Sequence, residues 1–416
     1  MVTERYPPNI MGGYEVACDA VARGLRRRGH KVAILTSDFG LSRPGTDAGD
    51  EFRLLHYGQG WPSLVQLARQ EIADHRAFRR VLSSWKPDVI YAWCLLHLFP
   101  SLHLVLRAAA APVVLNIQDS WLPQHLSEAE CQRKAWHRSG AGITKRLGKV
   151  ILRKTLKFLN PGWLRPMTAG DLPLDNIVFC SRFRLTEHDQ LGLPSGRTRV
   201  IYNGIDTSIF TGIPGRASRG PLKVLFVGRL VEEKGAHTAV EAIRALRCRG
   251  CQEIRLSIVG VPAYPLEYSR KLQRSVEVHQ LGDLVRFLGM VPHDALPEVY
   301  AQHDVLVFPS MINEGLPMTL IEAMACGLAV VGTTTGGSCE ILKEGVTGLT
   351  FPPGDSNKLA DCLQRLLNDQ TLHRNLAIAG QRLAREQFNI ETAVEQTESF
   401  LHEVVEDHAC HAELHV

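Results

Sequence analysis

The stretch LKVLFVGRLVEEKGAHTAVEAIRALRC (222–248) decides the fold of this chain of 416 residues. It begins as a continuous apolar run, turns between Gly228 and Gly235, and continues with apolar residues at helical spacing and a charged opposite face. A short apolar run of this kind is typical of a parallel strand that is buried on both faces and followed by a crossover helix.

The same alternation of strand and helix recurs on both sides of this stretch. Helical patterns are found at 14–28, 66–85, 235–248 and 356–368. Further strand-like runs lie at 31–36, 88–93, 111–117, 176–181, 198–203, 254–260, 284–289, 305–309, 328–333 and 347–351. Alternating elements predict an α/β fold with doubly wound parallel sheets and right-handed crossovers. About eleven strands and 416 residues predict two Rossmann-like domains rather than one.

Two local features complete the expected organisation. Residues 207–221 are rich in Gly, Pro and Ser and are predicted to form a surface linker. Only Met1, Val2 and Thr3 precede the first glycine turn as strand material, so the first strand is expected to be short or truncated. The last thirty residues are expected to be helical.

Composition limits the class of protein. Hydrophobic residues make up 45% and charged residues 22%, which excludes a disordered, collagen-like or coiled-coil chain. The net charge of +4 does not by itself indicate nucleic-acid binding.

Targeting signals and cysteines favour a cytoplasmic protein. The N-terminal residues contain no apolar segment of signal-peptide type, and the apolar stretch 89–115 is interrupted too often for a membrane span. The ten cysteines are scattered, as expected for reduced thiols. Cys248 and Cys251 form a CxxC that is either a zinc or redox pair or a chance spacing at a helix end.

Two glycine-containing turns are candidate phosphate sites. Gly12 and Gly13 open a helix, where glycine lets the backbone approach a ligand and the helix N-terminus attracts anions. The turn 228–235 follows a strand and carries Arg229 and Lys234, two cations suited to a diphosphate. For each turn, an ordinary turn or solvated loop remains the alternative.

Two further turns follow later strands. In the first, Glu314 lies in a loop, Gly315, Leu316, Pro317 and Met318 lead into a helix, and Glu322 lies inside that helix. The two carboxylates can therefore address different parts of one ligand, although a capping acid and a surface acid would give the same pattern. In the second, residues 333–337 read Thr-Thr-Thr-Gly-Gly, again between a strand and a helix.

Taken together, these motifs resemble the family 4 glycosyltransferases, which are retaining enzymes of GT-B architecture. The resemblance rests on GGYE (12–15), GRLVEEKG (228–235), EGLPMTLIE (314–322), and GTTTGGSCEIL (332–342) followed by GLTFPPGD (348–355). It covers nearly the whole chain and is strongest over 222–355.

The resemblance implies two Rossmann-like domains that face a cleft. The acceptor-side domain would be 1–195, with the C-terminal helix 386–416 packing back on it, and the nucleotide-sugar domain would be 196–385. It implies a hexosyltransferase-type enzyme that acts in glycan, glycolipid or polysaccharide synthesis.

The same resemblance assigns roles to the candidate residues. Arg229 and Lys234 would bind the donor pyrophosphate, Glu322 the ribose hydroxyls, and Glu314 would lie beside the transferred sugar, with 315–318 in the donor site. The backbone of Gly12 and Gly13 would approach the phosphates. No cofactor and no metal are expected, because the chain has no D-x-D motif and the two cations would stabilise the leaving diphosphate.

One position departs from the family pattern. Where the family often has a catalytic His after a strand, this chain has Gln118, which can hydrogen-bond a sugar but cannot carry charge near neutral pH. Gln118 is a candidate catalytic residue, or else a structural residue that the comparison misplaces.

The acceptor is the least defined partner. Residues 131–170 contain ten Lys or Arg and no acid, which suits an anionic membrane surface or lipid-linked acceptor, or a solvated basic face. Nucleic acid is not an expected partner. A GT-B hydrolase or epimerase acting on nucleotide sugars, and a non-catalytic nucleotide-sugar binder, remain the alternative functions.

Overall fold

The computed structural model describes residues 1–41, 46–58, 64–123, 126–127, 168–215, 220–261 and 266–413. The chain divides into two compact units. Unit 1 comprises Met1–Cys180, Arg184–Ile201 and Val394–Val416, and unit 2 comprises Ser181–Phe183 and Tyr202–Ala393. The sequence had placed the corresponding divisions at 195/196 and 385/386.

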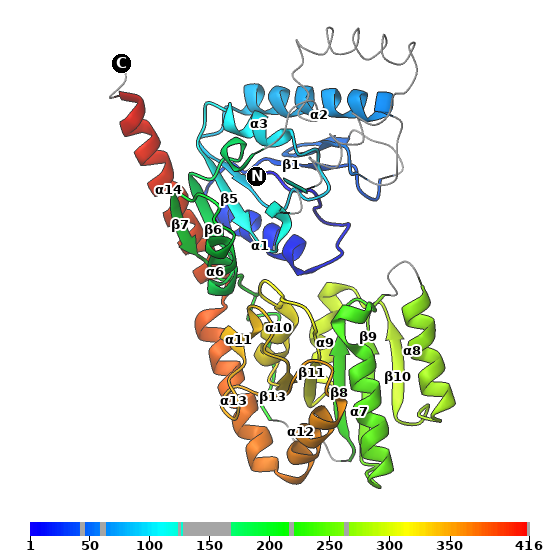
Figure 1. The fold of residues 1–416 in the computed structure, drawn as a ribbon. Helices are drawn as coiled ribbons and strands as arrows, with labels where there is room; N and C mark the ends of the chain where they lie inside the picture. Colours follow the sequence, from blue (N-terminus) through cyan, green and yellow to red (C-terminus); the bar gives the residue numbers. More distant parts are fainter. Residues whose placement is uncertain are drawn as a thin grey trace. The chain divides into compact units, whose positions relative to one another are not determined.

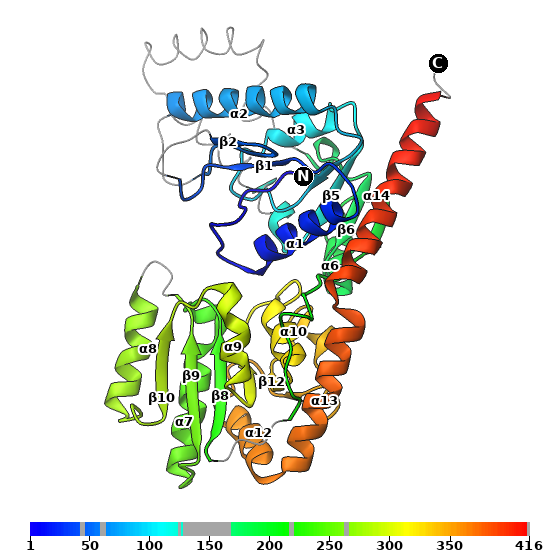
Figure 2. The same ribbon diagram turned by 180° about the vertical axis from the view of Figure 1, so that it is seen from behind.

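Helices and strands alternate along most of the described chain (Figures 1 and 2). Up to residue 201 the elements are α1 (Gly13–Arg27), β1 (Ile34–Ser37), β2 (Thr46–Ala48), β3 (Glu51–Leu55), α2 (Leu64–Trp85), β4 (Ile90–Ala92), α3 (Leu102–Arg107), β5 (Val113–Ile117), β6 (Asn176–Phe179), α6 (Arg182–Gln190) and β7 (Arg197–Val200). The later elements are β8 (Leu222–Val227), α7 (Ala236–Cys248), β9 (Ile254–Val259), α8 (Glu267–Val278), β10 (Val285–Gly289), α9 (Leu296–Ala301), β11 (Val305–Phe308), α10 (Met318–Ala325), β12 (Ala329–Gly332), α11 (Ser338–Ile341), β13 (Leu349–Thr350), α12 (Ser356–Asn368), α13 (Gln370–Gln387) and α14 (Ile390–Glu413).

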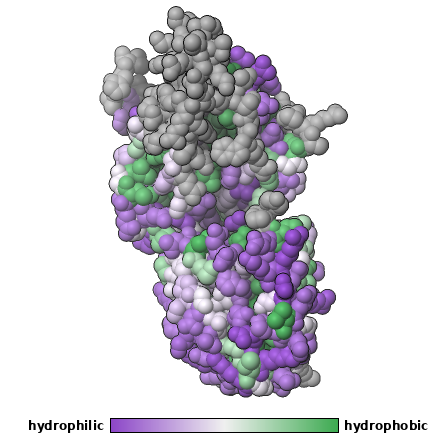
Figure 3. All heavy atoms as spheres, turned by 45° about the vertical axis from the view of Figure 1, so that its right-hand side comes forward, coloured by the Kyte–Doolittle hydropathy of each residue, from purple (hydrophilic) through white to green (hydrophobic). Residues whose placement is uncertain are grey.

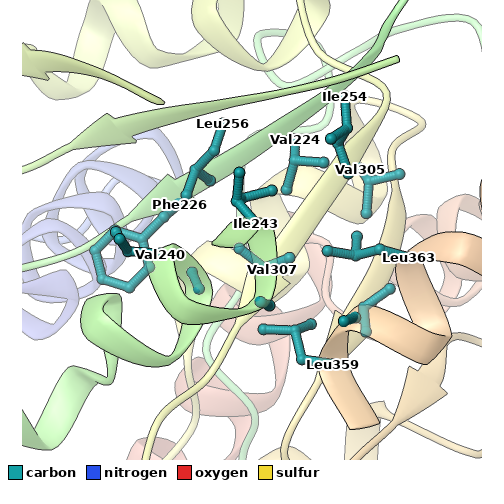
Figure 4. Close-up of a cluster of buried hydrophobic side chains, with 14 of the residues drawn as sticks. Val224, Phe226, Val240, Ile243, Ile254, Leu256, Val305, Val307, Leu359 and Leu363 are labelled. Carbon is teal, nitrogen blue, oxygen red and sulfur yellow. The ribbon is translucent and has the colours of Figure 1, made fainter. Parts of the chain in front are cut away.

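Unit 2 contains a six-stranded sheet in the order β10-β9-β8-β11-β12-β13, in which every pair is parallel. Val224 and Phe226 of β8 pack into a core with Ile243 of α7 and Leu359 of α12 (Figure 4). The intervening Leu225 is also fully buried, so helices cover both faces of the sheet. This confirms the doubly wound Rossmann-like prediction for the second half of the chain.

Unit 1 contains a second, mixed sheet. β4-β5-β6-β7 and β1-β3 are parallel, and Val2 bridges β1 and β4 by pairing with Leu35 and Ala92. The first strand position is thus filled by the few residues around Val2, which pair only through isolated bridges. β2 pairs antiparallel with β3, so the expectation of only parallel strands is wrong at this edge. A Rossmann-like core nevertheless forms.

The predicted linker lies within unit 2. Residues 207–215 pack on this unit: a Cβ at Gly212 would lie 2.0 Å from the carbonyl oxygen of Cys326, and Gln381 donates to the Gly212 carbonyl at 2.9 Å. The described part of 207–221 is therefore a partly exposed surface segment of unit 2 and does not connect the two units, while residues 216–219 lie outside the described part of the chain. Gly212 lets this segment pack closely against the C-terminal end of α10.

The remaining sequence expectations concern membrane spans and cysteines. The stretch 89–115 forms β4, α3 and β5, as predicted, and no described helix combines the length and apolarity that a membrane crossing needs. The nine cysteines that the structure describes are free. Cys248 is exposed and is the last residue of α7. The surface of unit 2 that is visible in Figure 3 is mainly polar, with scattered apolar residues.

Candidate active site

The carboxyl ends of β8, β11 and β12 lie at one edge of the unit 2 sheet, because these strands are parallel neighbours. The turn after β8 holds Arg229, which is exposed, and a short 3-10 turn that ends at Lys234. Gly235 follows with φ 71°, and a Cβ there would lie 2.0 Å from the Pro309 carbonyl oxygen. Glycine is required here by both its backbone conformation and the close approach of the loop after β11.

Lys234 and Glu314, which are 80 positions apart, form an ion pair between the Lys234 ammonium and Glu314 Oε1. The same oxygen accepts a hydrogen bond of 2.8 Å from the Ser310 hydroxyl. Both side chains are partly exposed, at 20% and 14%. The structure therefore brings together two of the predicted catalytic residues. The Lys234 ammonium group has three N–H donors, so it can donate to a ligand near the strand ends as well as to Glu314.

The loop that carries Glu314 is held by two glycines of the next turn. A Cβ on Gly336 would lie 2.3 Å from the Glu314 carbonyl oxygen, and one on Gly337 would lie 1.9 Å from that of Gly315. The Gly337 amide also donates to the Glu314 carbonyl at 2.8 Å. The Thr-Thr-Thr-Gly-Gly turn thus fixes the position of residues 314–315.

Glu322 lies inside α10 and is 3% exposed. Its Oε2 accepts a hydrogen bond of 2.9 Å from the Tyr300 hydroxyl, and its Oε1 lies 3.0 Å from His293 Nε2. Burial lowers the pKa of His293, but the hydrogen bond and charge of Glu322 outweigh that effect and raise it. A buried carboxylate is thereby held by two donors, and each oxygen retains capacity for another hydrogen bond.

The residues between these two acids form the start of α10. Gly315, Leu316, Pro317 and Met318 are all buried, and Pro317 occupies the position just before the helix. The predicted position of Pro317 at the helix start is thus found within one residue.

In unit 1, Gly12 and Gly13 are exposed at the start of α1. Glu15 Oε2 accepts a hydrogen bond of 2.9 Å from the Gly12 amide, and its Oε1 lies 3.3 Å from Arg5 Nε. Burial raises the pKa of Glu15 to about 7. The glycine turn is therefore anchored by the buried acid of the GGYE motif.

A buried acid beside this turn was missed by the sequence reasoning. Glu4 is fully buried and accepts hydrogen bonds from Arg5, from the Tyr14 hydroxyl at 2.8 Å, and from the His97 amide at 2.6 Å. Burial alone would raise the pKa of Glu4, but the His97 hydrogen bonds and the Arg5 charge lower it to about 2. Glu4 and His97 do not belong to a common sequence motif, so their contact could not be predicted from the sequence.

Gln118 follows β5 and is 7% exposed. Its amide nitrogen donates to Asn116 Oδ1 at 2.6 Å, and Asn116 in turn donates to the Tyr91 hydroxyl. This buried chain of hydrogen bonds ties the amide to its own sheet. Gln118, Gly12 and Gly13 belong to unit 1, whereas the other candidate residues belong to unit 2.

The sequence also marked the basic stretch 131–170, of which residues 131–167 lie outside the described part of the chain. Of the residues that the structure describes, His293 and Tyr300 were also missed, although they hold Glu322. Both occur in the short segment VPHDALPEVY (291–300).

Two family models match the chain. Residues 11–209 match Glycosyltransferase Family 4, and residues 215–383 match Glycosyl transferases group 1. Among curated proteins, the chain is 29% identical to the putative colanic acid biosynthesis glycosyltransferase WcaL of Salmonella typhimurium, over 61% of each chain. It is 27% identical to the glycogen synthase of Mycobacterium tuberculosis, over 95% of this chain and 92% of the relative. The match to this WcaL and the matches to two further curated glycosyltransferases span 52–61% of the length of those relatives.

Solved structures show the same fold at low sequence identity. Sucrose-phosphate synthase from Thermosynechococcus elongatus superposes with a TM-score of 0.73 at 21% identity, covering 98% of this chain and 99% of that chain. Anabaena Alr3699/HepE in complex with UDP gives a TM-score of 0.68 at 21% identity, covering 97% and 98%. The two-domain architecture predicted from the sequence is the architecture of these structures.

Proposed function

The chain belongs to glycosyltransferase family 4, and from this premise we propose that it transfers a sugar from a nucleotide-diphosphate sugar to an acceptor hydroxyl, with retention of configuration. The observation that carries the proposal is the Lys234–Glu314 ion pair at the carboxyl ends of the unit 2 strands. Glu314 lies in the loop before α10, and the buried Glu322 lies within that helix. Ligands of doubly wound folds bind at the carboxyl ends of the strands.

The donor site is proposed to lie in unit 2. Arg229 is exposed after β8 and has no ion-pair partner among the described residues, so its charge is available to a diphosphate. Lys234 would share its ammonium between Glu314 and the donor. Glu322, already oriented by Tyr300 and His293, would accept a hydrogen bond from a ribose hydroxyl. The binding of UDP by the similar Alr3699/HepE supports a nucleotide donor.

Transfer develops negative charge on the departing diphosphate and positive charge on the sugar ring. Cations fixed near the diphosphate stabilise that transition state more than the ground state. Arg229 and Lys234 are proposed to supply this stabilisation without a metal, and Glu314 is proposed to lie beside the sugar. Retention by attack on the face that the leaving phosphate vacates needs no covalent nucleophile on the protein.

The acceptor is proposed to bind to unit 1 and to be a glycan, a lipid-linked or a small molecule. The ten cations of 131–170 support an anionic membrane surface as a second partner, which would make the protein peripheral on the cytoplasmic face. Free thiols support a cytoplasmic location. Charge reversal of Arg153, Lys154 and Lys157 should weaken binding to anionic vesicles. Failure of the unmodified protein to bind such vesicles at low salt would contradict the membrane proposal.

A screen of nucleotide sugars by thermal shift tests the donor proposal first. A donor at 100 times its Kd adds about 2.7 kcal/mol to the free energy of unfolding, so the correct donor should raise Tm. Arg229→Ala and Lys234→Ala should then each lower turnover at least ~100-fold without unfolding the protein, because one lost electrostatic stabiliser costs about 2.7–4 kcal/mol in the transition state. Lys271→Ala, at an exposed cation on α8, is the matched control.

The alternatives give different products. A transferase releases nucleotide diphosphate in proportion to an added acceptor, whereas a hydrolase releases it without one and an epimerase does not release it. Near-normal turnover in both cation variants would contradict the proposed pyrophosphate site. Donor binding without any release under all acceptors would favour a non-catalytic binder.

A further inference from the structure

Three side chains that are common metal ligands meet on unit 1. His30 follows α1, and Glu398 and His402 lie on α14. His30 Nε2 is 2.7 Å from Glu398 Oε1, and the imidazole rings of His30 and His402 have their centroids 5.6 Å apart. One potential ligand atom from each residue lies within 4.8 Å of the other two.

The backbone around these residues is held in place by packing and helix capping. A Cβ at Gly24 of α1 would lie 2.3 Å from Val394 Cγ2, which shows how closely the two helices approach. Gly29, at φ 95°, ends α1, and the His30 amide donates back to the Leu25 carbonyl at 3.2 Å. This C-terminal cap fixes the direction in which His30 leaves the helix.

Glu398 and His402 are four residues apart on α14, so they lie on the same face one turn apart. The two helices therefore bring a carboxylate and two imidazoles together before any ion binds. Since the backbone is already in position, only side-chain adjustments are needed to surround an ion.

We propose that His30, Glu398 and His402 form a binding site for Zn²⁺ or a similar divalent transition-metal ion. Imidazole and carboxylate bind Zn²⁺ at about 2.0–2.2 Å, and a site with three protein ligands takes water at the fourth position. The hydrogen bond between His30 and Glu398 would open by roughly 0.6 Å, toward the ~3.3 Å spacing that tetrahedral ligands require. The ion would take the place of the shared proton.

Arg28 is the nearest identified cation, since its Nε lies 2.5 Å from Glu398 Oε2. Its charge opposes a metal ion, but Arg28 is 38% exposed, so water screens that charge. The contact also engages Oε2 and leaves Oε1 for the His30 side. Hydrogen bonds of this kind orient metal-binding carboxylates.

A bound ion would join the end of α1 to α14 and stabilise unit 1, because the ion binds a site that exists only in the folded chain. This proposal does not rest on the proposed sugar transfer, since none of its residues belongs to the donor site of unit 2. It is compatible with metal-independent chemistry at Arg229 and Lys234.

Titration calorimetry of the full, untagged chain with Zn²⁺, after removal of metals with a chelator, tests the site. We expect one bound Zn²⁺ and a rise in Tm of several degrees at saturating Zn²⁺. His402→Ala changes an exposed side chain and should weaken Zn²⁺ binding at least ~10-fold, and His30→Ala should do the same. Glu398→Gln keeps the shape of the side chain and removes its charge, and should also weaken binding.

His411→Ala is the matched control, because His411 is an exposed histidine further along α14. It should bind Zn²⁺ as the unmodified chain does. Absence of Zn²⁺ binding would overturn the proposal. Unchanged affinity in both His30→Ala and His402→Ala would also overturn it, because the bound ion would then lie elsewhere.

Discussion

Replacing Gly337 with alanine should impair catalysis through the position of one loop. Gly337 has φ −65°, which any residue adopts, so the substitution adds no backbone strain of its own. The added Cβ would lie 1.9 Å from the Gly315 carbonyl oxygen, whereas real Cβ contacts stay above 3.0 Å. The backbone that carries Glu314 and Gly315 must therefore move by about 1 Å.

A displacement of that size sets the expected magnitude. Misplacing a catalytic group by 1 Å can lower turnover about 100-fold, so we expect a fall of that order for Gly337→Ala. Overpacking a buried contact typically costs about 1–3 kcal/mol of the free energy of unfolding. Both effects share one cause, but the loss of turnover should greatly exceed what the folded fraction explains.

Steady-state transfer with the donor found by the thermal-shift screen, together with urea unfolding, measures the two effects. Gly250→Ala is the control: Gly250 has φ 82°, and a Cβ there meets nothing within 4 Å. Gly250 lies between α7 and β9, at the amino ends of the strands and away from the candidate site. The Gly250→Ala variant should lose about 1–2 kcal/mol of stability and keep normal turnover. Normal turnover in Gly337→Ala would refute the reasoning.

Substitutions at three further positions test the buried hydrogen bonds. Because the pKa of Glu4 is lowered to about 2, its contribution to the free energy of unfolding, on the order of 3 kcal/mol, should be complete above pH ~4.5 and disappear as the pH falls toward 2. Urea unfolding of Glu4→Gln should therefore differ from the unmodified chain near neutral pH and converge with it near pH 2; a pH-independent difference would contradict this. Tyr300→Phe removes one donor from the buried Glu322 and should cost about 1.5–3 kcal/mol of stability and weaken donor binding in calorimetry, whereas unchanged donor affinity would argue against a ribose contact at Glu322. Gln118→Ala should lower turnover by the equivalent of roughly 1–3 kcal/mol, and Gln118→His should keep partial activity with a new pH dependence near 6.5; full activity of the alanine variant would make Gln118 a structural residue.

The strands of both sheets could be predicted where apolar residues run without interruption. β8 and β11 were predicted within a residue or two because all four positions of β11 and four of the six positions of β8 are buried. β3 was missed because Arg53 interrupts the run, although Arg53 is 7% exposed and donates to the carbonyls of Tyr6 and Pro7. From the sequence alone, an arginine is expected at the surface, because arginine is rarely buried without hydrogen-bonding or charged partners.

The candidate site residues that lie within short sequence motifs could be predicted, whereas contacts between residues distant in the sequence could not. Lys234 and Glu314 stand in turns whose glycines are themselves informative, so both could be found one motif at a time. The partners of Glu322 could not, because His293 and Tyr300 lie 29 and 22 positions away and meet the carboxylate only through the fold. The same holds for Glu4 and His97, which are 93 positions apart.

Helix α14 gives unit 1 an unusual dependence on the order of synthesis. Most of unit 1 is encoded before residue 202, yet its core includes Val394, Phe400 and Val404, which emerge from the ribosome only after the intervening residues of unit 2. At about 5–20 residues per second, those residues take on the order of 10–40 s to make. During that interval the first two hundred residues expose the apolar surface that α14 later covers, and they are a natural client for chaperones that bind nascent chains.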